Sequence, residues 1–216
     1  MMKACIITGG RVNDQFVLQQ LAEQEYELMI AVDHGADFFA DKDIKPHHVV
    51  GDMDSARLVT KDQIGTWTGC MLHKYPAEKD ETDTELAISL AIEKQSDIIH
   101  IYGATGTRLD HVLGNIHILK KALDAGAECA IIDEYNKIRL INGTTIIRKK
   151  EQFGSYVSLL PWLGDVQGVC LRGMKYPLEN AVLPHGKALG VSNEIVDETA
   201  TIIIGSGIAV MIESRD

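Results

Sequence analysis

Two aspartates follow an apolar run in the segment VVGDMDS, residues 49–55. Asp52 and Asp54 lie two positions apart, so an extended chain would direct both carboxylates to the same side. Two like charges held this close need a neutralising partner, which makes a metal site one interpretation. A solvated turn and a helix cap are the alternatives that the segment permits on its own.

A second group of charged residues precedes an apolar helical pattern in KDETDTELAI, which starts at Lys79. Thr82 and Glu85 fit a capping box, which predicts that a helix begins just after Thr82. Asp83 would lie in the first turn, where its charge suits the helix dipole. The capping box does not account for Lys79, Asp80 and Asp83 together, so these three are candidates for a functional site at the start of the helix.

A third candidate is the segment GATGTRLDH, in which a predicted strand runs into a loop and then a helix. Gly103 and Gly106 would let backbone N–H groups approach a phosphate at the helix N-terminus. Arg108 adds a planar cation that suits phosphate oxygens, and Asp110 could face the same opening. An ordinary glycine turn with a surface Arg–Asp pair explains these residues equally well. No GxxxxGK[ST] motif is present in the sequence, which excludes a Walker-type nucleotide site.

Short apolar runs separated by helical patterns predict the elements that position these residues. The runs occupy residues 4–9, 28–33, 48–52, 98–103 and 128–133. Because they are apolar throughout, we expect strands that are buried on both faces, in a parallel sheet covered by helices. Ligands bind beyond the carboxyl ends of such strands, where Asp33, Asp52 and Asp54 are found.

The sequence pattern changes near residue 135. Beyond that point short strand-like runs alternate with turn signals, and the segment has no convincing helical pattern. The segment GSGIAV, residues 205–210, fits a hairpin turn between two late strands. We therefore expect an α/β domain over residues 1–135 and a small all-β domain over residues 136–216.

The composition is that of an ordinary globular protein. Of the 216 residues, 45% are hydrophobic and 24% are charged, which is enough for one large domain or two small ones. The net charge of −10 argues against a broad nucleic-acid surface. No apolar run reaches the length of a membrane span and no signal-peptide pattern is present, so we expect a cytoplasmic protein with no membrane partner. Four scattered cysteines without a CxxC pair predict reduced thiols, so any metal would be held by oxygen.

Together these motifs make the sequence resemble the thiamine pyrophosphokinase family over almost its whole length. AVDHGAD looks like the DGGAN segment of the family, VVGDMDS like its GDxDS and KDETDTELAI like its KDxTDxExAL. GATGTRLDHVLGN is similar to GxxGxRxDHxLxN, and VSNEI, residues 191–195, is similar to the SNE segment of the family's β domain. Two residues depart from the family pattern, because His34 replaces a glycine and Asp37 replaces an asparagine.

The resemblance implies transfer of a pyrophosphoryl group from ATP to the hydroxyl of thiamine, which gives thiamine diphosphate and AMP. It also implies an α/β fold in two parts: an N-terminal three-layer, parallel-sheet domain that handles the nucleotide, and a C-terminal all-β sandwich that binds thiamine. The protein would be a homodimer with its active site near the interface. Two alternatives are pyrophosphoryl transfer to another heterocyclic alcohol, such as a hydroxymethylpterin, and a non-catalytic thiamine- or nucleotide-binding module.

The matching motifs also imply roles for individual residues. A Mg²⁺ ion would join the ATP phosphates to the carboxylates of Asp52, Asp54 and Asp83. The residues expected to contact ATP are Asp33, Lys79, Asp80, Thr82, Gly103, Gly106 and Arg108. Asp110 would orient the thiamine hydroxyl, and the catalytic set is completed by Arg108, Asp83 and Asp52. Ser192 and Asn193 would hydrogen-bond to thiamine, while Trp162 would either stack on it or belong to the core of the β domain.

Overall fold

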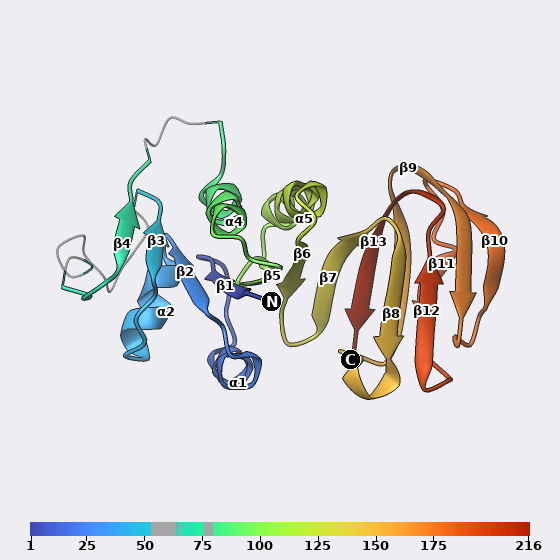
Figure 1. Ribbon diagram of the computed structural model, residues 1–216, viewed down its shortest axis with the longest axis horizontal. Coiled ribbons are helices and arrows are strands. Elements are labelled where there is room, and N and C mark those ends of the chain that lie inside the picture. The colour runs from blue at the N-terminus through green and yellow to red at the C-terminus, as the bar shows by residue number, and fades with distance from the viewer. Residues whose placement is uncertain (53–63, 65, 76–79) are drawn as a thin grey trace. The chain divides into compact units, whose positions relative to one another are not determined.

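The computed structural model describes residues 1–52, 64, 66–75 and 80–216 (Figure 1). The chain divides into two units, Met1–Glu134 and Tyr135–Asp216.

Within the described residues, a sheet of parallel strands forms the centre of the first unit, in the order β4-β3-β2-β1-β5-β6. These strands are β1 (Lys3–Ile7), β2 (Leu28–Val32), β3 (His48–Val50), β4 (Met71–His73), β5 (Ile98–Tyr102) and β6 (Glu128–Ile132). The central strands are largely apolar, and Ile6, Ile30 and Ile99 are completely buried. This arrangement confirms the predicted parallel sheet.

Helices cover both faces of this sheet and make the unit a three-layer structure (Figure 1). They are α1 (Asp14–Gln24), α2 (Gly35–Asp41), α4 (Asp83–Glu93) and α5 (Leu109–Asp124). The strand order runs outward from β1 to β4 and then returns to β5 on the other side of β1. Because crossovers between parallel strands are right-handed, this reversal places α1 and α2 on one face and α4 and α5 on the other.

The start of α4 has the predicted cap. The Thr82 hydroxyl oxygen accepts a hydrogen bond from the backbone N–H of Glu85 at 3.2 Å, which confirms Thr82 as the N-cap and the predicted start of the helix. The face of α4 that contains Ala87 and Ile88 is completely buried. The first turn of α4 is therefore the part of this helix that is available for contacts with a ligand.

The second unit is a sandwich of two antiparallel sheets. Its strands are β7 (Asn136–Ile141), β8 (Thr144–Arg148), β9 (Tyr156–Arg172), β10 (Leu178–Leu183), β11 (Gly190–Asn193), β12 (Thr199–Ile203) and β13 (Ser206–Ser214). One sheet has the order β7-β13-β9-β11 and the other has the order β8-β12-β9-β10. Buried side chains from both sheets, such as Leu159 and Met211 from one and Leu171 and Ile202 from the other, form a single core. The predicted β-sandwich is confirmed.

Strand β9 belongs to both sheets of the sandwich. Leu163 and Gly164 have φ values of 60° and 148°, which interrupt the extended backbone in the middle of β9. The pairing of β9 with β13 shifts register at this interruption, between Ser206 and Ile208. The chain therefore changes sheets here without a separate loop.

The expectation of a hairpin turn at residues 205–210 is wrong. The strand before this segment, β12, pairs with β8 and β9, whereas the strand after it, β13, pairs with β7 and β9. The segment therefore connects the two sheets of the sandwich. A glycine turn signal identifies the change of direction but not the partner of the next strand.

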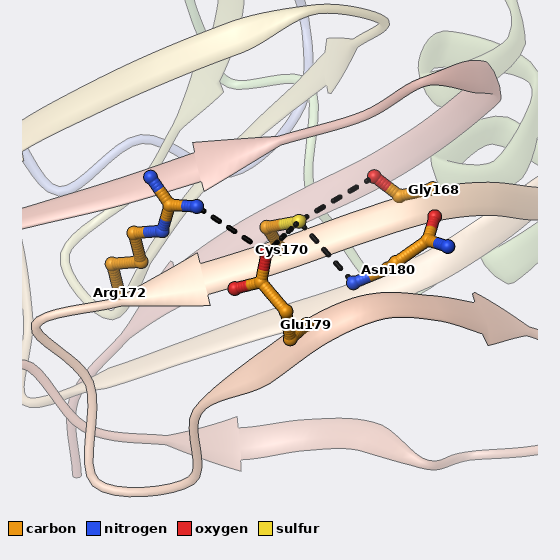
Figure 2. Close-up of polar contacts among 5 residues, drawn as sticks. All are labelled: Gly168, Cys170, Arg172, Glu179 and Asn180. Carbon is orange, nitrogen blue, oxygen red and sulfur yellow. Dashed lines mark hydrogen bonds and ion pairs between the residues drawn. The ribbon is translucent and has the colours of Figure 1, made fainter.

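The pairing of β9 with β10 contains a β-bulge at Cys170 (Figure 2). Two residues of β10, Glu179 and Asn180, lie opposite Cys170, and the Asn180 N–H donates to the Cys170 sulfur at 3.3 Å. Arg172 Nη2 lies 3.3 Å from Glu179 Oε1, to which the Cys170 thiol donates at 3.6 Å. These contacts account for Cys170 as part of the strand pairing.

All four cysteines are free, as predicted. Cys5 and Cys129 are buried, and burial raises the pKa of both thiols far above its usual value. Among the helices that the structure describes, none is long and apolar enough to cross a membrane.

His48 makes the stability of the first unit depend on pH. Its ring is buried, and its Nδ1 lies 2.9 Å from Nε2 of His73. Burial, and then the nearby charges of His73, Lys94 and His47, lower its pKa to about 4, against a small opposing effect of Glu93. In the unfolded chain the His48 imidazole has a pKa near 6.5, so acid favours the unfolded state. The His48 contribution to the free energy of unfolding is therefore fully present above pH 6.5 and is lost as the pH is lowered towards 4.

We expect that His48→Gln will weaken this acid sensitivity. At pH 5 the His48 contribution should lower the free energy of unfolding of the wild type by about 1 kcal/mol relative to pH 7.5, after allowance for solvent screening. Urea unfolding at the two pH values measures the difference, with the exposed His185→Gln as the control. An equal loss in the wild type and in His48→Gln would show that His48 is not the responsible group.

Candidate functional site

Polar loops follow β1, β2, β3 and β5 at one edge of the sheet in the first unit. Because these strands are parallel, their carboxyl ends meet at this edge. The strand order reverses between β1 and β5, since β1 leads to β2 on one side and β5 lies on the other. Open α/β sheets bind ligands at such a reversal, so these loops form the candidate site.

Asp33 and Gly51 are in direct contact at the ends of β2 and β3. The Asp33 N–H donates to the Val50 carbonyl at 3.0 Å, and Asp33 has a left-handed φ of 47°. Gly51 has a φ of 132°, and a Cβ added to it would overlap the Asp33 carboxylate. A side chain at residue 51 is therefore excluded by both conformation and space, and the Asp33 carboxylate lies against the backbone just before Asp52.

The loop after β5 is fixed by contacts on two sides. The Thr8 hydroxyl donates to the Gly103 carbonyl at 2.6 Å, and the Asn115 side-chain amide donates to the Ala104 carbonyl at 2.8 Å. Gly103 is buried, with a φ of 73°, whereas Gly106 is exposed and an added Cβ there would meet no atom within 4 Å. The fold therefore explains a glycine at residue 103 but gives no steric reason for one at residue 106.

Arg108 and Asp110 form an exposed ion pair at the start of α5. Arg108 Nε donates to Asp110 Oδ1 at 3.2 Å and Nη2 donates to Oδ2 at 2.5 Å. The hydrogen bond from Arg108 is the main reason that the pKa of Asp110 falls to about 2, and the pair also raises the pKa of Arg108. Asp110 is therefore a carboxylate at neutral pH, and the surface Arg–Asp pair that the sequence permitted is present.

The remaining predicted acidic residues lie in or before α4. Asp83 is half-buried in the first turn of the helix, and Thr82 and Asp80 are exposed just before it. Asp54 and Lys79 lie outside the described residues. Within the described part of the chain, no three His, Cys, Asp or Glu side chains converge as a metal site. The predicted ligand set of Asp52, Asp54 and Asp83 consequently stays a prediction.

The two departures from the family pattern contact each other. His34 Nδ1 lies 2.8 Å from Asp37 Oδ2, and the Asp37 side chain is buried. The His34 Cβ also lies beside Gly9 in the loop that follows β1. His34, which stands where the family pattern has a glycine, therefore has the Asp37 carboxylate within ion-pair distance of its ring.

The two residues expected to bind thiamine differ in exposure. Ser192 is exposed and has a left-handed φ of 59°, and its backbone N–H donates to the Ser158 hydroxyl at 3.0 Å. Asn193 is buried, and its amide hydrogen-bonds to the backbone of Tyr176 in both directions, at 3.0 and 2.8 Å, and accepts from the Glu194 N–H at 2.9 Å. The Asn193 amide therefore holds the segment in shape, while the Ser192 side chain faces outward.

Trp162 lies on β9, half-buried and opposite Ile208 on β13. The two expected roles of Trp162, packing within the β domain and stacking on thiamine, both stay predictions.

Sequence reasoning did not include two features of this edge. The first is the Thr8-Gly9-Gly10-Arg11 segment, of which the apolar pattern predicts only the end of a strand at residues 8 and 9. The second is Asn115, whose role the sequence motif does not predict. Its contact with Ala104 joins residues that are 11 positions apart and depends on how the helix leaves the loop.

Comparison with known proteins identifies the family of this chain. Residues 18–131 match the family model of the thiamin pyrophosphokinase catalytic domain, and residues 144–209 match that of the thiamin pyrophosphokinase vitamin B1 binding domain. The thiamine pyrophosphokinase of Bacillus subtilis strain 168 is 38% identical over 213 residues, which cover 98% of each chain.

Solved structures show the same similarity. The crystal structure of thiamine pyrophosphokinase from Bacillus subtilis has a TM-score of 0.86 at 35% identity, with 99% of each chain covered. The thiamin pyrophosphokinase from Geobacillus thermodenitrificans has a TM-score of 0.84 at 30% identity, with 100% of this chain and 98% of that chain covered. Given both family models and a relative at 38% identity over the whole chain, this protein belongs to the thiamin pyrophosphokinase family.

Proposed function

We propose that this protein transfers a pyrophosphoryl group from ATP to the hydroxyl of thiamine, releasing AMP and thiamine diphosphate. The observation that carries the proposal is the approach of the Asp33 carboxylate to Gly51, which directly precedes Asp52, at the sheet edge where a glycine loop and Arg108 also lie. Carboxylates, bare backbone amides and a guanidinium at one strand reversal are the groups that a metal–nucleotide complex needs. Membership of the family supplies the choice of thiamine as acceptor.

The donor set in this region fits a magnesium ion by its chemistry. Asp52 and Asp83 supply carboxylate oxygens, which hard divalent cations prefer, and Asp54 is the third predicted ligand. When bound, Mg²⁺ would neutralise phosphate charge and let an acidic site accept a polyanion.

The ATP phosphates would be held by the loop after β5 and by cationic side chains. Backbone N–H groups from Gly103 to Gly106 would face phosphate oxygens, and the open space over Gly106 supports a close approach there. Arg108 and Lys79 would add positive charge, while Asp80, Thr82 and Asp33 would complete the contacts with the nucleotide. Arg108 is engaged with Asp110 in the free protein, and a phosphate offers the same bidentate geometry to its guanidinium.

In the proposed reaction the thiamine hydroxyl oxygen forms a bond to the β-phosphorus of ATP. The bond between that phosphorus and the oxygen that bridges it to the α-phosphorus breaks, and AMP leaves with the electron pair. Asp110, a carboxylate at neutral pH, would accept a hydrogen bond from the hydroxyl and take its proton. Positioning and charge neutralisation are expected to contribute more than base strength to such a transfer.

Thiamine would be bound by the segment at residues 190–193 of the second unit. Ser192 presents an exposed hydroxyl as a direct hydrogen-bonding group, and Asn193 would act mainly by holding the turn through its contacts with Tyr176. The acidic character of the chain suits a cationic substrate.

A homodimer with the active site near its interface is also proposed, as the family resemblance implies. The second unit exposes several large apolar side chains, among them Leu163 at 73% and Leu189 at 63%. A dimer interface formed by this unit would cover side chains of this kind. The expected cytoplasmic location likewise stays a prediction.

The decisive assay incubates the protein with MgATP and thiamine and identifies products by mass spectrometry. Thiamine diphosphate and AMP in equal amounts are expected, with no AMP from MgATP and a hydroxymethylpterin. Turnover of the pterin alone would indicate the alternative acceptor. Thiamine binding in a calorimeter without AMP release would indicate a non-catalytic module.

We predict that Asp52→Asn and Asp83→Asn will each lower kcat by at least about 100-fold with Mg²⁺, because each removes charge that neutralises the metal–phosphate complex. Thermal unfolding should change little, since neither side chain belongs to the apolar core. Steady-state kinetics measure the effect, with the surface variant Asp124→Asn as the control. Wild-type turnover in either variant would remove that residue from the catalytic site.

We predict that Ser192→Ala will raise the KM for thiamine by about 5- to 20-fold and leave the KM for ATP within twofold, because one direct hydrogen bond is lost. The exposed Ser155→Ala, also in the second unit, is the matched control. An increase confined to the KM for ATP would assign the segment to the other substrate.

A further inference from the structure

The segment after β1, residues 8–11, lies at the reversal of strand order in the first unit. It follows one of the two strands that border the reversal, and the glycine loop that begins at Gly103 follows the other. The catalytic-domain family model begins to match only at residue 18, so this segment lies outside the matched range. Its position in the sheet places it beside the glycine loop at the strand reversal, where open α/β sheets bind ligands.

The segment is locked against the loop after β5. The Thr8 N–H donates to the Tyr102 carbonyl at 2.9 Å, and the Thr8 hydroxyl donates to the Gly103 carbonyl at 2.6 Å. A Cβ added to Gly10 would overlap the Gly103 carbonyl and would lie close to that of Thr105. Residues 8–10 and the loop that begins at Gly103 are therefore held together by contacts that leave no room for a side chain at Gly10.

Gly9 and Gly10 present exposed backbone in this position. Neither glycine has a left-handed φ, so the absence of side chains here is not required by backbone conformation. At Gly9 an added Cβ would make only a tight contact, 3.1 Å, with the Cβ of His34. Bare, exposed amides beside a second glycine loop are suited to contact with phosphate oxygens.

Arg11 supplies a cation directly after these glycines. It is exposed, and within the part of the chain that the structure describes it takes part in no ion pair. Arg108, which follows the glycine loop, is paired with Asp110. In a chain of net charge −10, this exposed guanidinium beside a strand end is suited to binding an anionic ligand.

From these observations we propose that residues 8–11 form a second phosphate-binding segment, in which the Gly9 and Gly10 amides and the Arg11 guanidinium bind the triphosphate of the nucleotide. The inference rests on the proposed function for the identity of the nucleotide as ATP. It adds a binding segment and a positioning cation that the family motifs in this sequence do not include.

Arg11→Gln tests the proposal because the substitution keeps length and polarity while removing the charge. The KM for ATP should rise by about 10-fold or more, with the KM for thiamine within twofold and the unfolding temperature unchanged. Arg11→Lys should recover part of the loss. The matched control is Arg172→Gln, another exposed arginine, which should leave both KM values unchanged.

Calorimetry with Mg²⁺ and a non-hydrolysable ATP analogue gives a readout that does not depend on turnover. Arg11→Gln should weaken binding of the analogue about 10-fold and leave binding of adenosine, which has no phosphate, unchanged. Normal analogue affinity in Arg11→Gln, or an increase confined to the KM for thiamine, would overturn the proposal while the wild type still makes thiamine diphosphate. If the wild type makes no thiamine diphosphate and Arg11→Gln still weakens binding of the analogue, the proposed acceptor is overturned, and residues 8–11 remain a phosphate-binding segment.

Discussion

The close approach of backbone segments at the carboxyl edge of the first sheet is the constraint on which the candidate site depends. Side chains are excluded at Gly10, Gly35 and Gly51, where an added Cβ would overlap Gly103, Ile7 and Asp33 respectively. These contacts set the spacing of the loops after four parallel strands. The apolar strands beneath them fix the sheet, so the loops can hold polar groups in place without a core of their own.

The same edge contains a conflict of charge that the proposed chemistry resolves. Asp33 and Asp52 place carboxylates at the edge where we propose that a triphosphate binds, in a chain that is already acidic. A divalent cation would compensate for part of this charge, and Arg108 and Arg11 at the two sides of the strand reversal would compensate for more. The Arg108–Asp110 pair keeps one of these cations oriented before any nucleotide is bound.

Sequence patterns predicted the elements whose signal is local. The apolar runs that became β1, β2 and β5, and the Thr82 cap of α4, were evident because each depends on neighbouring residues. Helix α2 was not anticipated because seven residues are too short for a clear helical period. Strand β4 was not anticipated because, unlike the fully buried β3, it has no buried residue to give an apolar run. The change of sheet within β9 was missed for a different reason, because pairing partners are set by the whole sandwich.

The candidate site likewise has features with a local sequence signal and features that depend on contacts between distant residues. Residue types and spacing identified Asp33, Asp52, Gly103 and Arg108 as candidates. They did not reveal that Gly51 must lack a side chain because the Asp33 carboxylate occupies its space, or that Asn193 is occupied by the backbone of Tyr176. Contacts of this kind join residues that are distant in sequence, so a single chain without its fold does not predict them.

Hydrogen–deuterium exchange tests most directly whether the nucleotide lies at the strand reversal. With Mg²⁺ and a non-hydrolysable ATP analogue, the account predicts slower exchange of the amides in residues 8–11 and 103–108 together, and thiamine alone should slow residues 190–195 instead. Protection by the analogue that leaves both segments after β1 and β5 unchanged would contradict it.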